Sequence, residues 1–232
     1  MIENLPIYIS LLFSLTTLIT LFLFSQILQQ SSLSKSSTNY IILGMVIWLV
    51  LQAFLTLFNF YNIETTSNPP RFILLVAPPF ILTLLVLVSK KGQALIDTLS
   101  LKALTFIHIV RIPVEIVLYW LSLNKAVPEL MTFSGRNFDI LVGITAPFVS
   151  YFGIEKRWFS KKILLLWNFV SLGLLVNIVV NAVLSSPVSF QKFAFDQPNI
   201  AVTHFPFSWL PCFIVPIALF CHLAAIRKLL AS

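Results

Sequence analysis

Residues 101–122 read LKALTFIHIVRIPVEIVLYWLS, an apolar run that is interrupted by a histidine, an arginine and a glutamate. A helix of about 20 residues is long enough to cross the hydrocarbon core of a membrane. A charged side chain at the centre of a bilayer costs about 2.5 to 3.5 kcal/mol on insertion scales. The stretch therefore predicts a membrane-spanning helix whose one polar face is directed into protein rather than lipid.

The composition of the whole chain agrees with a membrane protein. Of its 232 residues, 58% are hydrophobic and 10% are charged, and the mean hydropathy is +0.96. Soluble domains are about 25% charged. Windows long enough to span a membrane follow one another at 6–28, 39–61, 70–89, 101–122, 138–154, 162–184 and 205–226. We therefore expect an all-α membrane protein, a single domain over residues 1–232 that forms a bundle of seven transmembrane helices.

The distribution of lysine and arginine predicts the orientation of this bundle. With the N-terminus outside, the inner loops and tail hold Lys35, Lys90, Lys91, Lys102, Lys156, Arg157, Lys161, Lys162, Arg227 and Lys228. The outer loops hold only Arg71, Lys125, Arg136 and Lys192. Because cytoplasmic loops carry the excess of basic residues, we expect the N-terminus outside and the C-terminus in the cytoplasm.

Two further features concern the surroundings of the protein. The net charge of +7 is spread over short loops instead of forming one basic face, which argues against a nucleic-acid partner and for the lipid bilayer. The loops are short and the sequence has no N-x-S/T glycosylation site, which favours a bacterial inner (plasma) membrane.

Four polar residues share one face of the helix at 101–122. At about 100° per residue, His108, Arg111, Glu115 and Tyr119 fall within about 80° of one another on a helical wheel. Arg111 and Glu115 stand four positions apart, so each is the simplest partner for the other. Pro113 lies between them and is expected to distort the helix there.

Other helices offer polar residues that could join this face. Asn177 and Asn181 lie in the half of the window 162–184 that is expected to match the depth of Glu115. His222, in the last window, is expected at the same depth as His108, and Asn168 is similarly deep. These residues extend the predicted polar interior beyond a single helix.

The window 138–154 carries a stripe of small or polar residues on one face. The stripe consists of Asp139, Gly143, Ala146, Ser150 and Gly153. Such a stripe lets a neighbouring helix approach closely. Asp139 stands at the outer end of the window, where we expect it to act as a helix cap.

Prolines interrupt several of the windows. Kinked helices are expected at Pro78 and Pro79 in the window 70–89, and likewise at Pro113, Pro147, Pro206, Pro211 and Pro216. The outer loop at 185–204 interleaves phenylalanines with polar residues, which is typical of a lid or a short amphipathic segment in the membrane interface.

The polar interior supports three functional hypotheses. In the first, the protein is a small transporter or ligand-binding membrane protein, in which Arg111 binds a small anionic ligand and His108 or Glu115 carries a proton. In the second, His108 and His222 are ligands for haem or a metal in a membrane-embedded redox protein or enzyme. In the third, the Arg111 and Glu115 pair is purely structural and the protein is an assembly subunit without a small ligand.

Overall fold

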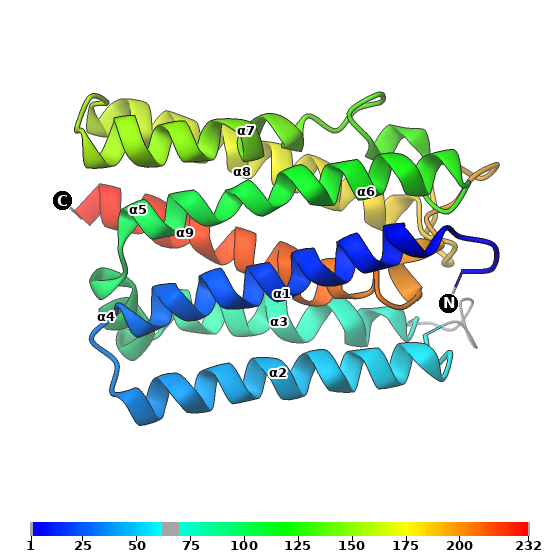
Figure 1. Ribbon diagram of the computed structural model, residues 1–232, viewed down its shortest axis with the longest axis horizontal. Coiled ribbons are helices and arrows are strands. Elements are labelled where there is room, and N and C mark those ends of the chain that lie inside the picture. The colour runs from blue at the N-terminus through cyan, green and yellow to red at the C-terminus, as the bar shows by residue number, and fades with distance from the viewer. Residues whose placement is uncertain (1, 62–69, 232) are drawn as a thin grey trace.

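The computed structural model describes residues 2–61 and 70–231, and the chain is all-helical, with 74% helix and no strand in the described residues. The long helices run along a common axis, and the N- and C-termini lie at opposite ends of the bundle (Figure 1). The elements are α1 (Ile7–Gln29), α2 (Lys35–Leu57), α3 (Phe72–Val88), α4 (Lys90–Thr98), α5 (Leu101–Phe106), η1 (Ile107–Val110), α6 (Arg111–Leu123), η2 (Glu129–Met131), α7 (Asp139–Phe148), η3 (Val149–Glu155), α8 (Lys161–Leu184), η4 (Ala201–Thr203), η5 (Leu210–Ile214) and α9 (Val215–Ala231).

Several of these helices are apolar enough to cross a membrane. By length and composition, α1, α2, α8 and the continuous helix of η5 and α9 each qualify. A fifth span is obtained if α3 and α4, which meet at an angle of 84°, are taken together. The outward faces of α1, α2 and α8 expose large apolar side chains, such as Leu11, Val50 and Leu166. These observations are consistent with integration into a membrane.

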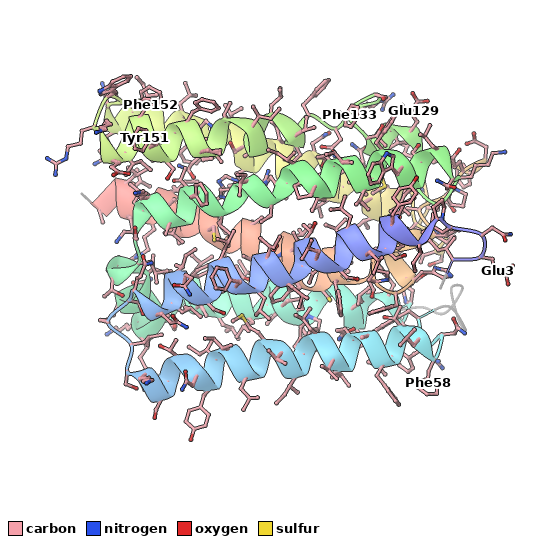
Figure 2. All side chains as sticks on the ribbon, viewed as in Figure 1. Glu3, Phe58, Glu129, Phe133, Tyr151 and Phe152 are labelled. Atoms are coloured by element: carbon pink, nitrogen blue, oxygen red, sulfur yellow. The ribbon has the colours of Figure 1, made fainter. Side chains whose placement is uncertain are left out.

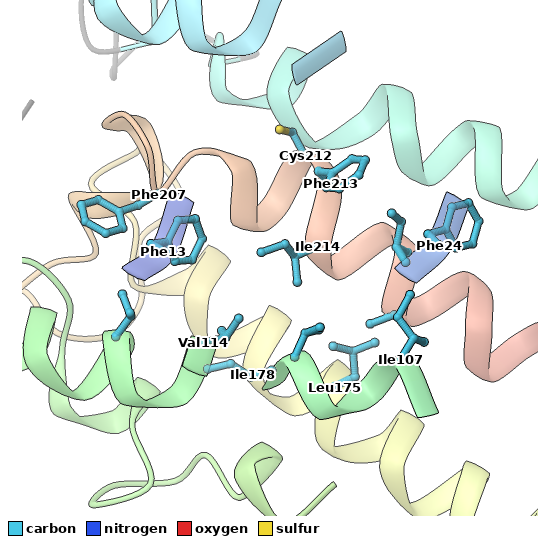
Figure 3. Close-up of a cluster of buried hydrophobic side chains, with 14 of the residues drawn as sticks. Phe13, Phe24, Ile107, Val114, Leu175, Ile178, Phe207, Cys212, Phe213 and Ile214 are labelled. Atoms are coloured by element: carbon cyan, nitrogen blue, oxygen red, sulfur yellow. The ribbon is translucent and has the colours of Figure 1, made fainter. Parts of the chain in front are cut away.

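The central helix of the bundle is the one formed by η5 and α9. In the most apolar 18 residues of this helix 67% are buried, whereas in the most apolar 18 residues of α2 only 17% are buried. Figure 3 shows apolar side chains that converge on this helix from its neighbours, among them Phe13 and Phe24 of α1 and Leu175 and Ile178 of α8. His222, the histidine on the central helix, is therefore surrounded by protein and is 0% exposed.

Some helices begin or end at other residues than the hydropathy windows predict. At these ends hydrogen bonds, and not hydropathy, determine where the helix begins or ends. The second helix covers Lys35–Leu57 instead of 39–61. The hydroxyl of Ser34 accepts a hydrogen bond from the backbone N–H of Ser37, which starts the helix early. Asn59 adopts a left-handed conformation (φ 56°) just beyond the last turn. The last helix extends past its window to Ala231, and Arg227 and Lys228 in its final turns both bond to Asp97 of α4.

The chain bends by 84° between α3 and α4, beyond Pro78 and Pro79. Both prolines lie inside α3, which continues to Val88. The chain turns instead at Ser89, whose hydroxyl caps α4 by accepting a hydrogen bond from the N–H of Gly92. The bend therefore lies at a cap and not at the prolines.

Other prolines coincide with irregular helix, as predicted. The 3₁₀ segment η1 comes immediately before the helix that contains Pro113, and the π-helix η3 begins two residues after Pro147. The π-helix η5 contains Pro211, and Pro216 follows it in α9. A π-turn inside a helix is frequently found at a functional site.

Candidate functional site

The polar face of α5, η1 and α6 points into the bundle, as the sequence predicts. His108, Arg111 and Glu115 are 1%, 3% and 1% exposed. Tyr119 is only half-buried and stacks on Phe133, with ring centroids 4.9 Å apart. Figure 2 shows Phe133 and Glu129 together near the end of the bundle that holds the N-terminus. Three of the four residues thus lie in the interior, and Tyr119 lies at its edge.

The ion-pair partner of Arg111 is Asp139. Nη1 of Arg111 donates to Oδ1 of Asp139 at 2.5 Å, and both side chains are buried. The prediction that Arg111 pairs with Glu115 is therefore wrong, as is the prediction that Asp139 serves only as a cap. The sequence did contain a signal for this partner. Asp139 belongs to the stripe of small or polar residues, and such a stripe brings its helix close to a neighbouring helix.

Gly143 explains how Asp139 reaches Arg111. A Cβ atom on Gly143 would lie 2.8 Å from Cγ1 of Ile112 and 3.0 Å from its backbone nitrogen. The backbone of α7 therefore lies closer to η1 and α6 than it could if position 143 carried a side chain. The predicted close approach along this stripe is confirmed here.

Glu115 is held by an asparagine that the sequence analysis did not single out. Nδ2 of Asn137 lies 2.7 Å from both carboxylate oxygens of Glu115 and also donates to the carbonyl of Met131. Oδ1 of Asn137 accepts the backbone N–H of Asp139 at 3.1 Å. Asn137 thus links the carboxylate of Glu115 to the backbone N–H of Asp139, and it comes from a loop, where helical periodicity gives no signal.

The hydrogen bonds of His222 determine its tautomer. Nη2 of Arg111 lies 3.1 Å from Nε2 of His222, and Nδ1 of His222 lies 3.0 Å from Oδ1 of Asn168. A guanidinium can only donate, so Nε2 accepts. The proton must then be on Nδ1, which donates to Asn168. His222 is therefore a neutral imidazole that accepts from a cation.

His108 lies at the same depth as His222, as predicted. The two rings are stacked with centroids 3.8 Å apart and planes 12° apart, and the ring of Trp167 flanks both. Neither ring nitrogen of His108 has a hydrogen-bond partner among the described residues. Buried polar atoms are nearly always bonded, so the two ring nitrogens of His108 are exceptions, as is Nε of Arg111.

This arrangement does not fit haem or a metal bound by His108 and His222. Both nitrogens of His222 are already bonded, to Arg111 and Asn168. A metal ligated by imidazole lies near the ring plane at about 2.0 to 2.1 Å from the nitrogen, and one ion cannot lie in two stacked planes. No group of three or more His, Cys, Asp or Glu within residues 2–61 and 70–231 is arranged to hold a metal.

Asn177 and Asn181 belong to a different group. Nδ2 of Asn177 donates to the carbonyl of Arg136, and Nδ2 of Asn181 donates to Oδ1 of Asn177. They join α8 to the loop before α7 and are not hydrogen-bonded to Glu115. Their expected place beside Glu115 is taken by Asn137.

The buried side chains form one chain of hydrogen bonds, which we call the buried network. It runs through Glu115, Asn137, Asp139, Arg111, His222 and Asn168. These residues come from α6, the loop before α7, α7, α9 and α8. The network therefore joins four helices through charged or strongly polar groups in the interior.

Comparison with known proteins yields one match. Residues 70–230 match the model of a family described as Domain of unknown function (DUF8737). No curated protein and no solved structure matches the chain. Every residue of the buried network lies inside the matched region.

Proposed function

The chain belongs to the family described as Domain of unknown function (DUF8737), and from its buried network we propose that it is a small proton-coupled transporter of an anionic ligand in a bacterial inner membrane. The proposal has three parts, which are the number of membrane crossings, a proton held by the network, and an anion bound by Arg111. Each part rests on its own observation and has its own test.

We propose seven crossings, with the N-terminus outside and the C-terminus in the cytoplasm. Beyond the spans given above, residues 101–123 are helical without a break through α5, η1 and α6, and residues 139–155 through α7 and η3. At 1.5 Å per residue these two segments are about 34 and 26 Å long. The basic loops cluster at the end of the bundle that holds the C-terminus, which supports a cytoplasmic position for that end.

Cysteine accessibility tests this topology. Single cysteines replace Lys91 and Lys156 for one end of the bundle, and Lys125 and Lys192 for the other, and all four positions are exposed. In intact cells a membrane-impermeant thiol reagent should label only the cysteines at positions 125 and 192. Labelling of both pairs from the same side would contradict the proposed crossings.

The proposal rests mainly on the charge balance of the buried network, which indicates that the network holds a proton. Two carboxylates, Glu115 and Asp139, share one guanidinium, Arg111, while His222 is neutral. With both carboxylates ionised, the cluster would have a net charge of −1. Burying an uncompensated charge is strongly unfavourable. We therefore propose that the network holds one exchangeable proton on its carboxylates.

A proton on Asp139 gives Arg111 a second role. The neutral carboxyl group is a weaker partner for the guanidinium, so an incoming carboxylate or phosphate can replace it. The anion enters together with a second proton, so that both carboxylates are neutral, the anion balances Arg111, and the net charge of the interior stays at zero. Because the network joins α6, α7, α8 and α9, a change in its bonds alters the packing of all four helices, as alternating access requires.

Infrared spectroscopy tests the proton directly. Protein in lipid nanodiscs at neutral pH should show the carbonyl band of a buried protonated carboxyl group. The band should disappear in either Glu115→Gln or Asp139→Asn, and it should persist in Glu3→Gln, because Glu3 is exposed. A folded wild-type protein without this band would overturn the proton site.

Transport is tested in proteoliposomes that contain a pH-sensitive dye. Succinate, glutamate or inorganic phosphate, added outside, should acidify the interior in at least one case. The double variant Arg111→Gln with Asp139→Asn has no buried ion pair to disrupt and should fold, yet it should show no such acidification. Equal acidification in the double variant, or none with any of the three anions, would refute the carrier.

A further inference from the structure

A polar cavity of about 380 Å³ lies at the N-terminal end of the bundle, beside the turn that leads from α6 to η2. It is lined by Tyr119, Ser122, Leu123, Lys125, Glu129, Thr132, Ser134 and Gln197. Glu129, at the edge of this region, is labelled in Figure 2. We propose that this cavity binds a small zwitterion of the α-amino acid class, with Lys125 on its carboxylate and Glu129 on its ammonium group.

The charges that line the cavity favour a zwitterion over a simple ion. Lys125 and Glu129 each lack an ion-pair partner within residues 2–61 and 70–231. A bound anion would be repelled by Glu129, and a bound cation would be repelled by Lys125. A molecule that carries both charges can neutralise both residues at once.

The backbone at Lys125 gives independent support. Lys125 has φ 58°, and the N–H groups of Lys125 and Ala126 bond to the carbonyls of Ser122 and Leu121. This is the bonding pattern of a helix C-terminus at which glycine is strongly preferred. A lysine stands here despite the conformational cost, at the position that lets its ammonium line the cavity.

The walls of the cavity are fixed by hydrogen bonds. Nε2 of Gln197 donates to the carbonyls of Ser122 and Val127, at 3.0 and 2.6 Å, which ties the loop at 185–204 to the end of α6. The hydroxyl of Thr132 donates to the carbonyl of Glu129. The loop at 185–204 thus contributes Gln197 to one side of the cavity, and the hydroxyl groups of Ser122 and Ser134 on its other sides can bond a polar ligand.

The cavity lies about one helical turn from the buried network, toward the end of the bundle that holds the N-terminus. Tyr119 is one helical turn from Glu115 on the same face, which is about 6 Å along the helix axis. Met131, next to the cavity wall at Thr132, accepts a hydrogen bond from Asn137, and Asn137 in turn binds Glu115. A zwitterion bound in the cavity would therefore lie about one helical turn from the buried network.

Thermal unfolding of the purified full-length protein in nanodiscs tests the binding site. L-alanine and L-glutamine should raise the unfolding temperature, whereas acetate and methylammonium, which carry one charge each, should not. A charge-assisted hydrogen bond contributes about tenfold in affinity, so Glu129→Gln should weaken binding by about that factor. Lys192→Gln, which changes an exposed lysine outside the cavity, should bind as the wild type does.

Lys125→Gly is the most informative variant, because it should fold at least as well as the wild type and still lose about tenfold in affinity. Binding that is unchanged in both Lys125→Gly and Glu129→Gln would overturn the site, as would the absence of any stabilisation by L-alanine and L-glutamine. The infrared band of the buried proton does not depend on this cavity. The presence of the band without amino-acid binding would refute the zwitterion site alone, and its absence with amino-acid binding would refute the proton site alone.

Discussion

Arg111 and Asp139 lie 28 positions apart on different helices, yet Nη1 of the arginine donates to the aspartate at 2.5 Å in the buried centre of the bundle. The second guanidinium nitrogen, Nη2, binds His222 on a third helix. One cation therefore holds three helices together, and removal of any of its partners affects all of them.

The first prediction concerns the Arg111 and Asp139 pair. Arg111→Gln leaves two buried carboxylates without a cation, and Asp139→Asn removes the direct ion-pair partner of Arg111, so each change alone should destabilise the protein by about 3 to 5 kcal/mol. The double variant should cost much less, and the difference is the coupling energy of a double-mutant cycle. Free energies of unfolding in detergent micelles measure this. The same cycle for Arg111 and Glu115 should show a smaller coupling, and the reverse order would contradict the observed pairing.

Asn137 should be essential for stability although it lies in a loop. Asn137→Ala removes the donor that binds Glu115 and leaves a buried carboxylate unbonded. Hydrogen bonds to charged groups contribute about 1.5 to 3 kcal/mol, so a loss of that size is expected in the unfolding free energy. Asn177→Ala is the control, because Asn177 is exposed and donates only to a backbone carbonyl. Equal losses in both variants would show that Asn137 has no special role.

Gly143 should tolerate no side chain. Gly143→Ala places a methyl group 2.8 Å from Ile112 and 3.3 Å from Cβ of Arg111, which must push α7 away from η1 and α6. Overpacking of this kind costs about 1 to 3 kcal/mol. Gly173→Ala is the matched control, because no neighbouring atom lies within 4 Å of the position that its methyl group would occupy, and it should stabilise α8 by about 0.5 to 1 kcal/mol. Melting temperatures that fall equally in both variants would argue against the close approach.

His108 and His222 should respond oppositely to replacement by phenylalanine. His108→Phe keeps the stacked ring and removes two unbonded nitrogens, so the unfolding free energy should change by less than about 1 kcal/mol or should rise. His222→Phe leaves Nη2 of Arg111 without its acceptor and Oδ1 of Asn168 without its donor, and it should cost about 2 to 3 kcal/mol or more. A large loss in His108→Phe would show that its ring nitrogens are bonded in the native protein.

The sequence by itself determined the features that depend on local periodicity. Hydropathy indicated an all-helical membrane protein, and a spacing of three or four residues placed His108, Arg111 and Glu115 on one buried face. The same reasoning marked Gly143 as a point of close approach and matched the depth of His108 and His222. Each of these follows from positions along one helix, because helical geometry repeats every 3.6 residues.

Only the tertiary structure decided which groups meet. Arg111 could pair with Glu115 on its own helix, but α7 packs so closely at Gly143 that Asp139 is the nearer partner. Asn137 binds Glu115 from the loop before α7, whose path no periodicity describes, while Asn177 bonds the backbone of the same loop at Arg136. The physical reason is that a buried charge bonds to whichever partner the packing of neighbouring helices brings within about 3 Å, and that distance is a property of the assembled bundle.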